Sequence, residues 1–312
     1  MRAIRVHRTG GPEVLQIEEV ADPQPGRGEV LVRLRAAGVN PVDAYLRAGA
    51  FGRVAQLPYT PGMDGAGEVV AWGADVSGRA KGERVYVAGA PTYAELVAAP
   101  AEAVWALPDH TTYEQGAAIG VPYVTAHLAI HFTGHARSGD RILVRGGSGG
   151  VGIAAIQIAV AHGCPVVATA GTAEGQALVR AHGATALAHD DLAGLAAAAG
   201  GQGYHLIVEM LANVNLASDL TLVADGGCVA VVGARGEATI DARLLLGHTS
   251  SVRGVMRVPP DERRQIHAAL GAGLRNRSLS PVVGPRFPLA EAAAAHAAVR
   301  APGAHGKIAL IC

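Results

Sequence analysis

The N-terminal third of the chain alternates short apolar runs with glycine and proline. Runs of β-branched, aromatic and other apolar residues bounded by such turn residues are typical of β-strands. This part of the chain is therefore predicted to form a β-rich, barrel-like domain. The expected strands are Ala3–His7, Val14–Val20, Glu29–Val39, Gly67–Trp72, Glu83–Val87 and Tyr93–Ala98.

The pattern changes after about Thr112, where apolar strands alternate with alanine-rich segments long enough for helices. That alternation is typical of a parallel sheet with helices on both faces. A helix-like stretch follows at Pro260–Leu274, and the apolar run Ile308–Ile311 is a candidate to rejoin the first domain. The expected strands of the second part are Arg141–Val144, Val166–Ala170, Thr185–Ala188, His205–Glu209, Cys228–Val232 and Val252–Met256.

A glycine-rich turn joins the first of these strands to a helix. The sequence Arg-Gly-Gly-Ser-Gly-Gly-Val-Gly at residues 145–152 places Gly147, Gly149 and Gly152 in a G-x-G-x-x-G pattern, and Ile153–His162 follows with helical spacing. One glycine permits the turn, one lets the backbone approach a pyrophosphate, and one lets helix and strand pack closely. Free amides at the helix N-terminus favour the phosphates. The pattern predicts a dinucleotide site.

These two sequence patterns predict an α/β protein with a Rossmann dinucleotide-binding domain and a second, β-rich domain that is expected to be catalytic. We expect the Rossmann domain over residues 114–259 and the β-rich domain over residues 1–113 and 260–312. In open α/β sheets ligands bind at the carboxyl ends of the strands, so the active site is expected there, in the cleft between the domains.

The end of the second strand decides between the two nicotinamide nucleotides. An NAD enzyme usually places a carboxylate there against the ribose hydroxyls, whereas this strand ends in Ala170-Gly171. That leaves room for a 2′-phosphate, for which Arg235 and His189 are candidate partners. Glu174 is the counter-argument, because it follows within a turn. NADPH is expected in preference to NADH.

Composition excludes several other classes. Lys and Arg number 26 against 26 Asp and Glu, so no strong field attracts nucleic acid or an anionic membrane. No apolar run has the length of a signal peptide or a membrane span, which predicts a cytoplasmic protein. Cys164, Cys228 and Cys312 are odd in number and widely spaced, so neither a disulfide framework nor a cysteine metal site is expected.

Over essentially its whole length the chain resembles the zeta-crystallin type of quinone oxidoreductase, in the medium-chain dehydrogenase/reductase superfamily. The resemblance is carried by segments at residues 38–49, 57–62, 116–126, 148–152 and 209–216. It implies that the β-rich domain is GroES-like. Gly147 stands where these proteins commonly carry alanine, and Ala177 where relatives often carry a lysine that can meet the 2′-phosphate.

The resemblance also implies a zinc-independent member. Zinc-dependent alcohol dehydrogenases of this fold place a cysteine ligand where this chain has Asn40, and Gly-His-Glu where it has Gly62-Met63-Asp64. The lobe of four clustered cysteines is missing. Without a metal that polarises an alcohol, reduction of activated acceptors is the expected chemistry. The implied partner is a quinone or a conjugated carbonyl.

The family's cofactor contacts carry over to positions spread along the chain. Lys307 and Thr125 are expected to neighbour the bound nucleotide, Thr125 with a place in the catalytic site. The remaining contacts fall on Tyr45, Ser148, Gly149, Gly150, Val151, Gly152, Gly171, His189, Asn215, Val232, Gly233, Ala234, Arg235, Val255, Met256 and Arg257.

Asn40 and Tyr45 are the expected catalytic donors. An amide and a phenol in front of the nicotinamide can hydrogen-bond a carbonyl oxygen as negative charge develops on it. Packing for Tyr45 and a turn-stabilising role for Asn40 are the structural alternatives. Asp43 and Asp64 are interpreted as solvated loop charges rather than polar orienters.

His127, His131 and His135 recur every four positions, which would place them on one face of a helix. A solvated helix flank is the preferred interpretation over a metal site. No metal is expected in this protein.

The function expected from these observations is that of an NADPH-dependent quinone reductase, active as a homodimer or homotetramer. The subunits are expected to pair along Val252–Met256. The nearest alternative is an NADPH-dependent enal or enone reductase. A second alternative is a largely non-catalytic NADPH-binding or RNA-associated protein, which the neutral charge balance disfavours.

Overall fold

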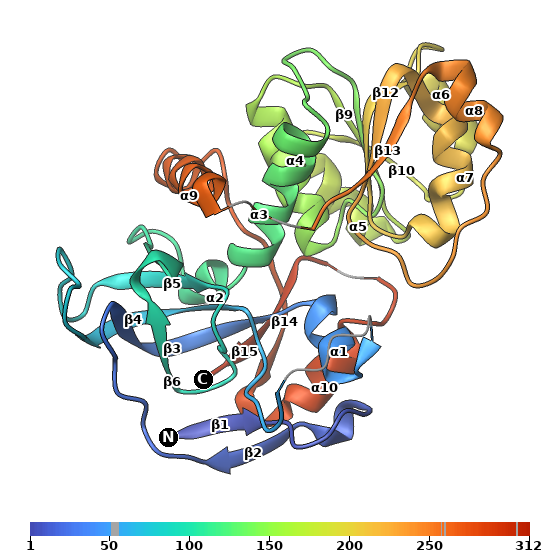
Figure 1. The fold of residues 1–312 in the computed structure, drawn as a ribbon. Helices are drawn as coiled ribbons and strands as arrows, with labels where there is room; N and C mark the ends of the chain where they lie inside the picture. The colour runs from blue at the N-terminus through green and yellow to red at the C-terminus, as the bar shows by residue number, and fades with distance from the viewer. Residues whose placement is uncertain (51–55, 257, 259, 304) are drawn as a thin grey trace. The chain divides into compact units, whose positions relative to one another are not determined.

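A computed structural model describes residues 1–50, 56–256, 258, 260–303 and 305–312. The chain forms two compact units, one of Met1–Val121 with Ser280–Cys312 and one of Pro122–Leu279 (Figure 1). Residues 114–121 thus belong to the first unit and helix α9 (Pro260–Arg275) to the second. The domain bounds expected from the sequence, 1–113 with 260–312 and 114–259, stay a prediction.

The first unit is built on a seven-stranded sheet, with β1 (Arg2–Arg5) and β2 (Gln16–Glu19) as a separate antiparallel pair. Its helices include α1 (Pro41–Arg47), α2 (Tyr113–Gly116) and α10 (Ala292–Ala298). The strand order of the sheet is β14 (Val283–Pro288), β15 (Lys307–Ile311), β3 (Glu29–Val39), β4 (Asp64–Trp72), β5 (Arg84–Ala88) and β7 (Val104–Ala106), with β6 (Leu96–Pro100) also paired to β3.

Strand β3 organises this sheet, and it has the bounds that the sequence predicts. Along it Val32 and Leu34 are buried whereas Arg33 and Arg35 are exposed, which is the alternation of a strand with one face on a core. The C-terminal strand β15 pairs antiparallel with β3, as expected for its apolar run. Strand β14 was not expected, because prolines flank its short apolar run.

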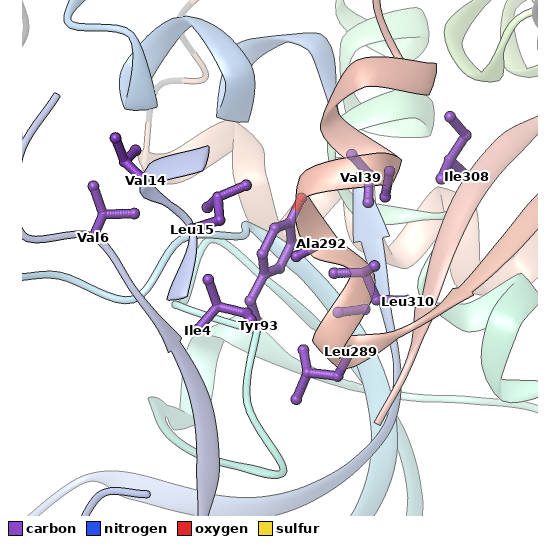
Figure 2. Close-up of a cluster of buried hydrophobic side chains, with 12 residues drawn as sticks. Ile4, Val6, Val14, Leu15, Val39, Tyr93, Leu289, Ala292, Ile308 and Leu310 are labelled. Atoms are coloured by element: carbon purple, nitrogen blue, oxygen red, sulfur yellow. The ribbon is translucent and has the colours of Figure 1, made fainter. Parts of the chain in front are cut away.

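The core of the first unit joins residues from both ends of the chain. Figure 2 shows the ring of Tyr93 among Ile4, Leu15 and Ala292, with Leu310 nearby. The N-terminal strand and the C-terminal segment therefore bury the same apolar surface, which fixes β15 against β3.

The second unit is a six-stranded parallel sheet. Its helices, in chain order, are α3 (Gly120–His127, whose first residues belong to the other unit), α4 (Gly150–Ala161), α5 (Ala173–Ala181), α6 (Leu192–Ala198), α7 (Ala212–Leu222), α8 (Ala242–His248) and α9. All six expected strands are confirmed, although β12 begins five residues before the expected Cys228. Their order is β10 (Thr185–Leu187), β9 (Val166–Thr169), β8 (Ile142–Val144), β11 (Tyr204–Glu209), β12 (Val223–Val231) and β13 (Ser251–Gly254).

The expected histidine face holds for His127 and His131, whose ring centres lie 4.5 Å apart, and is wrong for His135. Helix α3 ends at His127, a π-helical turn spans Leu128–Thr133, and His135 lies beyond it with a positive φ of 49°. The wider turn brings the ring of His131 to 4.8 Å from that of His162. Spacing by four predicts a shared face only in a regular α-helix.

Across the part of the chain that the structure describes, no helix has the length and apolar character needed to cross a membrane.

Candidate active site

The glycine turn joins β8 to α4 as the sequence predicts. Gly146 has a φ of 79°, so the left-handed residue lies one position before the first glycine of the motif. The N–H of Gly147 donates to the carbonyl of Thr169 at 2.7 Å, which ties the turn to β9. Gly149 is the N-cap of α4. Because glycine has no side chain to cap them, the first amides of α4 suit an anion.

The surroundings of each glycine show which of them serves a ligand. A Cβ on Gly152 would lie 2.2 Å from the carbonyl oxygen of Gly146, and one on Gly147 would lie 2.7 Å from Cβ of Ala168. A Cβ on Gly149 would meet only the Gly146 oxygen, at 3.8 Å. The first two glycines therefore serve close packing, and Gly149 leaves a backbone face open. This cradle fits the pyrophosphate of a dinucleotide.

Strand β9 ends without a carboxylate, and a histidine that follows β10 lies beside its tip. A Cβ on Gly171 would lie 3.2 Å from Cδ2 of His189, so the structure brings these two predicted residues together. Nδ1 of His189 lies 2.9 Å from the hydroxyl of Thr169. Glu174 is exposed in the first turn of α5.

Arg145, the residue before the turn, is buried in a network that the sequence did not reveal. Its Nε donates to Oδ1 of Asp219 at 2.8 Å, its Nη2 to the hydroxyl of Ser218, and its Nη1 to the carbonyl of His189, both at 3.0 Å. Both charged side chains are almost fully buried. A buried guanidinium needs such a set of acceptors, because unpaired charge inside a protein is costly.

Glu209, at the end of β11, is buried beside Asp219. Burial and then the charge of Asp219 raise the pKa of Glu209 to about 8. Its Oε1 accepts from the Asn215 amide at 3.1 Å and from the N–H of Leu211. Asn215, expected at the cofactor, thus uses its side-chain amide to hold this buried carboxyl group.

The other predicted residues of this unit lie on several elements. Ser148 is largely buried, Gly150 and Val151 are half-buried at the start of α4, and Thr125 is half-buried on α3. After β12, Val232, Gly233 and Ala234 are half-buried and Arg235 is exposed. Val255 and Met256 line a pocket of about 580 Å³ with Leu128 and Phe132. Arg257 lies outside the described residues.

In the first unit, Asn40, Asp64 and Lys307 form a buried cluster. Nζ of Lys307 donates to Oδ2 of Asp64 at 2.8 Å and to Oδ1 of Asn40, and Nδ2 of Asn40 donates to the same Asp64 oxygen at 2.9 Å. Oδ1 of Asp64 accepts the N–H of Val121 at 2.7 Å. Both oxygens of the buried carboxylate thus meet donors.

Two signature glycines make room for this cluster. A Cβ on Gly38 would lie 2.7 Å from Cε of Lys307 and 2.1 Å from the carbonyl oxygen of Ala117. A Cβ on Gly120 would lie 2.2 Å from Oδ1 of Asp64. Two of the segments that carry the family resemblance, 38–49 and 116–126, thus meet at one buried ion pair.

The interpretation of Asp43 and Asp64 as solvated charges is wrong, because these residues are only 2% and 0% exposed. Oδ2 of Asp43 accepts the N–H of Asn40 at 2.9 Å, which caps α1, and the hydroxyl of Tyr93 at 3.2 Å. Burial raises the pKa of Asp43 to about 7. Both carboxylates hold the segment that carries Asn40 and Tyr45.

Tyr45 lies half-buried on α1, with the guanidinium of Arg300 5.6 Å from its ring centre. The amide of Asn40 is engaged by Asp64 and Lys307.

Where zinc-dependent alcohol dehydrogenases carry ligands, the described residues present an amide and a carboxylate paired with an ammonium. Among those residues no group of three or more His, Cys, Asp and Glu side chains could hold a metal ion. Asn40, Asp64 and Lys307 do not fit a zinc site, because the ammonium occupies the carboxylate and only a weakly donating amide remains.

Fold and site define the class of protein. A parallel sheet with an open glycine cradle, together with a second unit that has a GroES-like sheet, is the architecture of the medium-chain dehydrogenase/reductases. Family models agree: residues 26–109 match an alcohol dehydrogenase GroES-like domain and residues 150–271 a zinc-binding dehydrogenase. That second description concerns the family and is not evidence of zinc in this chain.

The chain belongs to the quinone oxidoreductase family, of the zeta-crystallin type, which confirms the resemblance. It is 44% identical to the quinone oxidoreductase of Sus scrofa over 100% of this chain and 98% of that one. A solved structure of the quinone oxidoreductase of Thermus thermophilus, also determined with NADPH, is 33% identical with a TM-score of 0.86 over the whole of both chains. A solved NAD-dependent alcohol dehydrogenase is 29% identical with a TM-score of 0.92, again over both whole chains.

Proposed function

We propose that the protein is an NADPH-dependent, zinc-independent quinone reductase. The observation that carries this proposal is the open cradle at Gly149, at the uncapped N-terminus of α4, in a chain 44% identical to a quinone oxidoreductase over its full length. The Thermus relative has been solved with NADPH, and the His189 edge at the tip of β9 supports the same nucleotide here.

Different parts of the nucleotide are assigned to different residues. The amides of Ser148 to Gly152 bind the pyrophosphate, and Gly171 with His189 receives the adenosine ribose. Asn215, Gly233 and Val255 line the path toward the nicotinamide, which supplies the reducing equivalents when the nucleotide is bound. The other expected contacts, Val232, Ala234, Arg235, Met256 and Arg257, are assigned to the same path.

Polarisation of the acceptor falls to neutral donors. In this proposal Tyr45 hydrogen-bonds the acceptor oxygen as charge develops on it, and Thr125 neighbours the nucleotide. Asn40 and Lys307 both bind Asp64 and so hold the start of α1 next to β15. An acceptor that is already electrophilic, such as a quinone, needs no stronger polarisation.

Steady-state turnover tests the proposal. We expect NADPH consumption with a simple para-quinone to exceed consumption with a 2-alkenal, and purified enzyme to carry no stoichiometric zinc by elemental analysis. Turnover of the alkenal alone would assign the protein to the enone reductases. Absence of turnover with both acceptors, or zinc required for turnover, would overturn the proposal.

We further propose that the protein is a homodimer paired along the edge strand β13. This strand is hydrogen-bonded to β12 and ends the strand order of its sheet. Val252 on β13 and Met256 just after it are exposed apolar residues, 36% and 78% respectively. An edge that continues the sheet into a second copy would cover both.

A further inference from the structure

The structure places a threonine, a histidine and an arginine in contact at the tip of β9, where nicotinamide nucleotides are distinguished. This inference rests on the proposed binding of NADPH. We propose that Thr169 and Arg145 are positioning residues that hold His189 as a neutral N–H donor, and that His189 takes up a proton when a 2′-phosphate binds beside Gly171. His189 would then determine the preference for NADPH over NADH.

The hydroxyl of Thr169 decides which ring nitrogen of His189 carries the proton. Thr169 is fully buried, and its oxygen accepts the N–H of Gly146 at 3.1 Å. Its own hydrogen needs an acceptor, and among the described residues Nδ1 of His189, 2.9 Å away, is within reach. Nδ1 therefore accepts, and the hydrogen of the neutral ring is on Nε2.

The ring edge that carries this hydrogen lies beside Gly171, just after β9. A Cβ on Gly171 would be 3.3 Å from Nε2 of His189, so the ring edge lies over this glycine. Gly171 and His189 are both exposed, in contrast to Thr169. The end of the second strand of a dinucleotide fold is where the adenosine ribose is recognised. The Nε2 edge is thus available to a ribose substituent.

Arg145 holds the backbone that carries this ring. Its Nη1 donates to the carbonyl of His189 at 3.0 Å, while Asp219 and Ser218 fix the rest of the guanidinium. The same residue begins the glycine turn. Arg145 therefore links the pyrophosphate cradle to the ribose-binding edge through one buried side chain.

Partial burial of His189 and the charges around it favour the neutral ring while no phosphate is bound. Burial of the ring and then the positive charge of Arg145 hold the pKa of His189 below its ordinary value, and Asp190 acts in the opposite direction. Glu174, on the neighbouring α5, is exposed. Protonation would also cost the hydrogen bond from Thr169, because a charged ring has no acceptor nitrogen. A phosphate dianion supplies the favourable interaction that reverses this balance.

The test is the ratio of the dissociation constants of NADH and NADPH, measured by fluorescence titration between pH 6 and pH 8. Phosphate raises the pKa of a nearby histidine, so the ratio in the wild-type protein should rise on acidification, by on the order of fivefold. His189→Gln keeps an N–H donor at the Nε2 position but cannot titrate. Its ratio should follow only the ionisation of the nucleotide's own phosphate.

Thr169→Val separates positioning from folding. Without the hydroxyl, Nδ1 is free to accept a proton, so the midpoint pH of the change in the ratio of dissociation constants should move upward. Thr169→Ser keeps the hydroxyl and should keep the wild-type pH profile. A loss of stability alone would weaken both nucleotides equally and leave this midpoint unchanged. Arg145→Lys, which cannot reach all three acceptors, should lower the ratio at every pH.

Two results would overturn the inference: a wild-type ratio that changes with pH no more than that of His189→Gln, or coincident profiles for Thr169→Val and Thr169→Ser. Either result is distinct from failure of the proposed function. If the proposed function failed, neither nucleotide would bind, or NADPH would bind without any turnover of quinone.

Discussion

The ammonium of Lys307 lies 2.8 Å from the carboxylate of Asp64, and the two side chains are 4% and 1% exposed. These residues are 243 positions apart in the chain. Their pairing fastens the C-terminal strand β15 to β4, across β3, at the point where Asn40 leads into α1. One buried ion pair thus connects the two chain segments of the first unit, next to the helix that carries Tyr45.

Loss of this ammonium should destabilise the protein strongly. Lys307→Met leaves Asp64 buried without its cation, and we expect the free energy of unfolding to fall by about 3–5 kcal/mol in urea denaturation. The double variant Lys307→Met with Asp64→Asn should recover part of the loss. Lys81→Met, at an exposed lysine, should change the stability by less than about 0.5 kcal/mol. A Lys307→Met protein as stable as that control would contradict the role of the pair.

The glycine turn offers a matched pair of substitutions. Gly149→Ala meets no close atom of the chain, so the melting temperature should be unchanged while the methyl group displaces the pyrophosphate. Loss of one charge-assisted hydrogen bond corresponds to a Kd for NADPH that is roughly tenfold higher or more. Gly152→Ala brings Cβ within 2.2 Å of the Gly146 oxygen, so it should lower the melting temperature as well. Equal melting losses for both variants would argue against the open face at Gly149.

Glu209 should make the protein less stable as the pH rises. Its pKa is raised from 4.5 to about 8 in the folded protein, so between these values the folded state holds a proton that the unfolded state lacks. Stability is therefore lost progressively through that window, with a slope of up to about 1.4 kcal/mol per pH unit. Asp43, with its pKa raised to about 7, adds a loss of the same sign.

Glu209→Gln isolates this effect. The amide mimics the protonated carboxyl group, so the variant should gain stability relative to the wild type as the pH rises from 5 to 8. The buried histidines, such as His296 with its pKa lowered to about 4, destabilise the fold below pH 6.5. Their contribution cancels in the difference between the two proteins. A difference in unfolding free energy that is independent of pH would show that Glu209 is ionised in the native state.

The exposed edge of β13 leads to a prediction about assembly. Light scattering coupled to size exclusion should give twice the chain mass of 31.6 kDa. Val252→Lys places a charge on the edge and should shift the protein toward monomer. Leu246→Lys is the control, because Leu246 is also an exposed apolar residue, at 81%, but lies on α8. A monomeric wild type, or dissociation by the control alone, would refute pairing through β13.

Much of the architecture follows from local patterns in the sequence. The alternation along Glu29–Val39 and the continuous apolar runs of the parallel strands reflect which faces must be buried, and that requirement acts residue by residue. The glycine turn is equally local, because its backbone constraints fall within one short segment. For the same reason the spacing alone predicts that the backbone at Gly149 approaches the pyrophosphate.

Tertiary structure alone decided what charged residues do. Asp64 reads as a loop charge, since its partner Lys307 is distant in the sequence and is brought there by the pairing of β15 with β3. Asp43 meets Asn40, three residues away, but its burial depends on the tertiary fold. Arg145 likewise meets Asp219 because β8 pairs with β11, which leads into the helix α7 that carries Asp219. The sequence determined which segments become strands, helices and the phosphate turn, whereas burial of an ion pair depends on distant segments meeting, because a charge enters a core only with its partner.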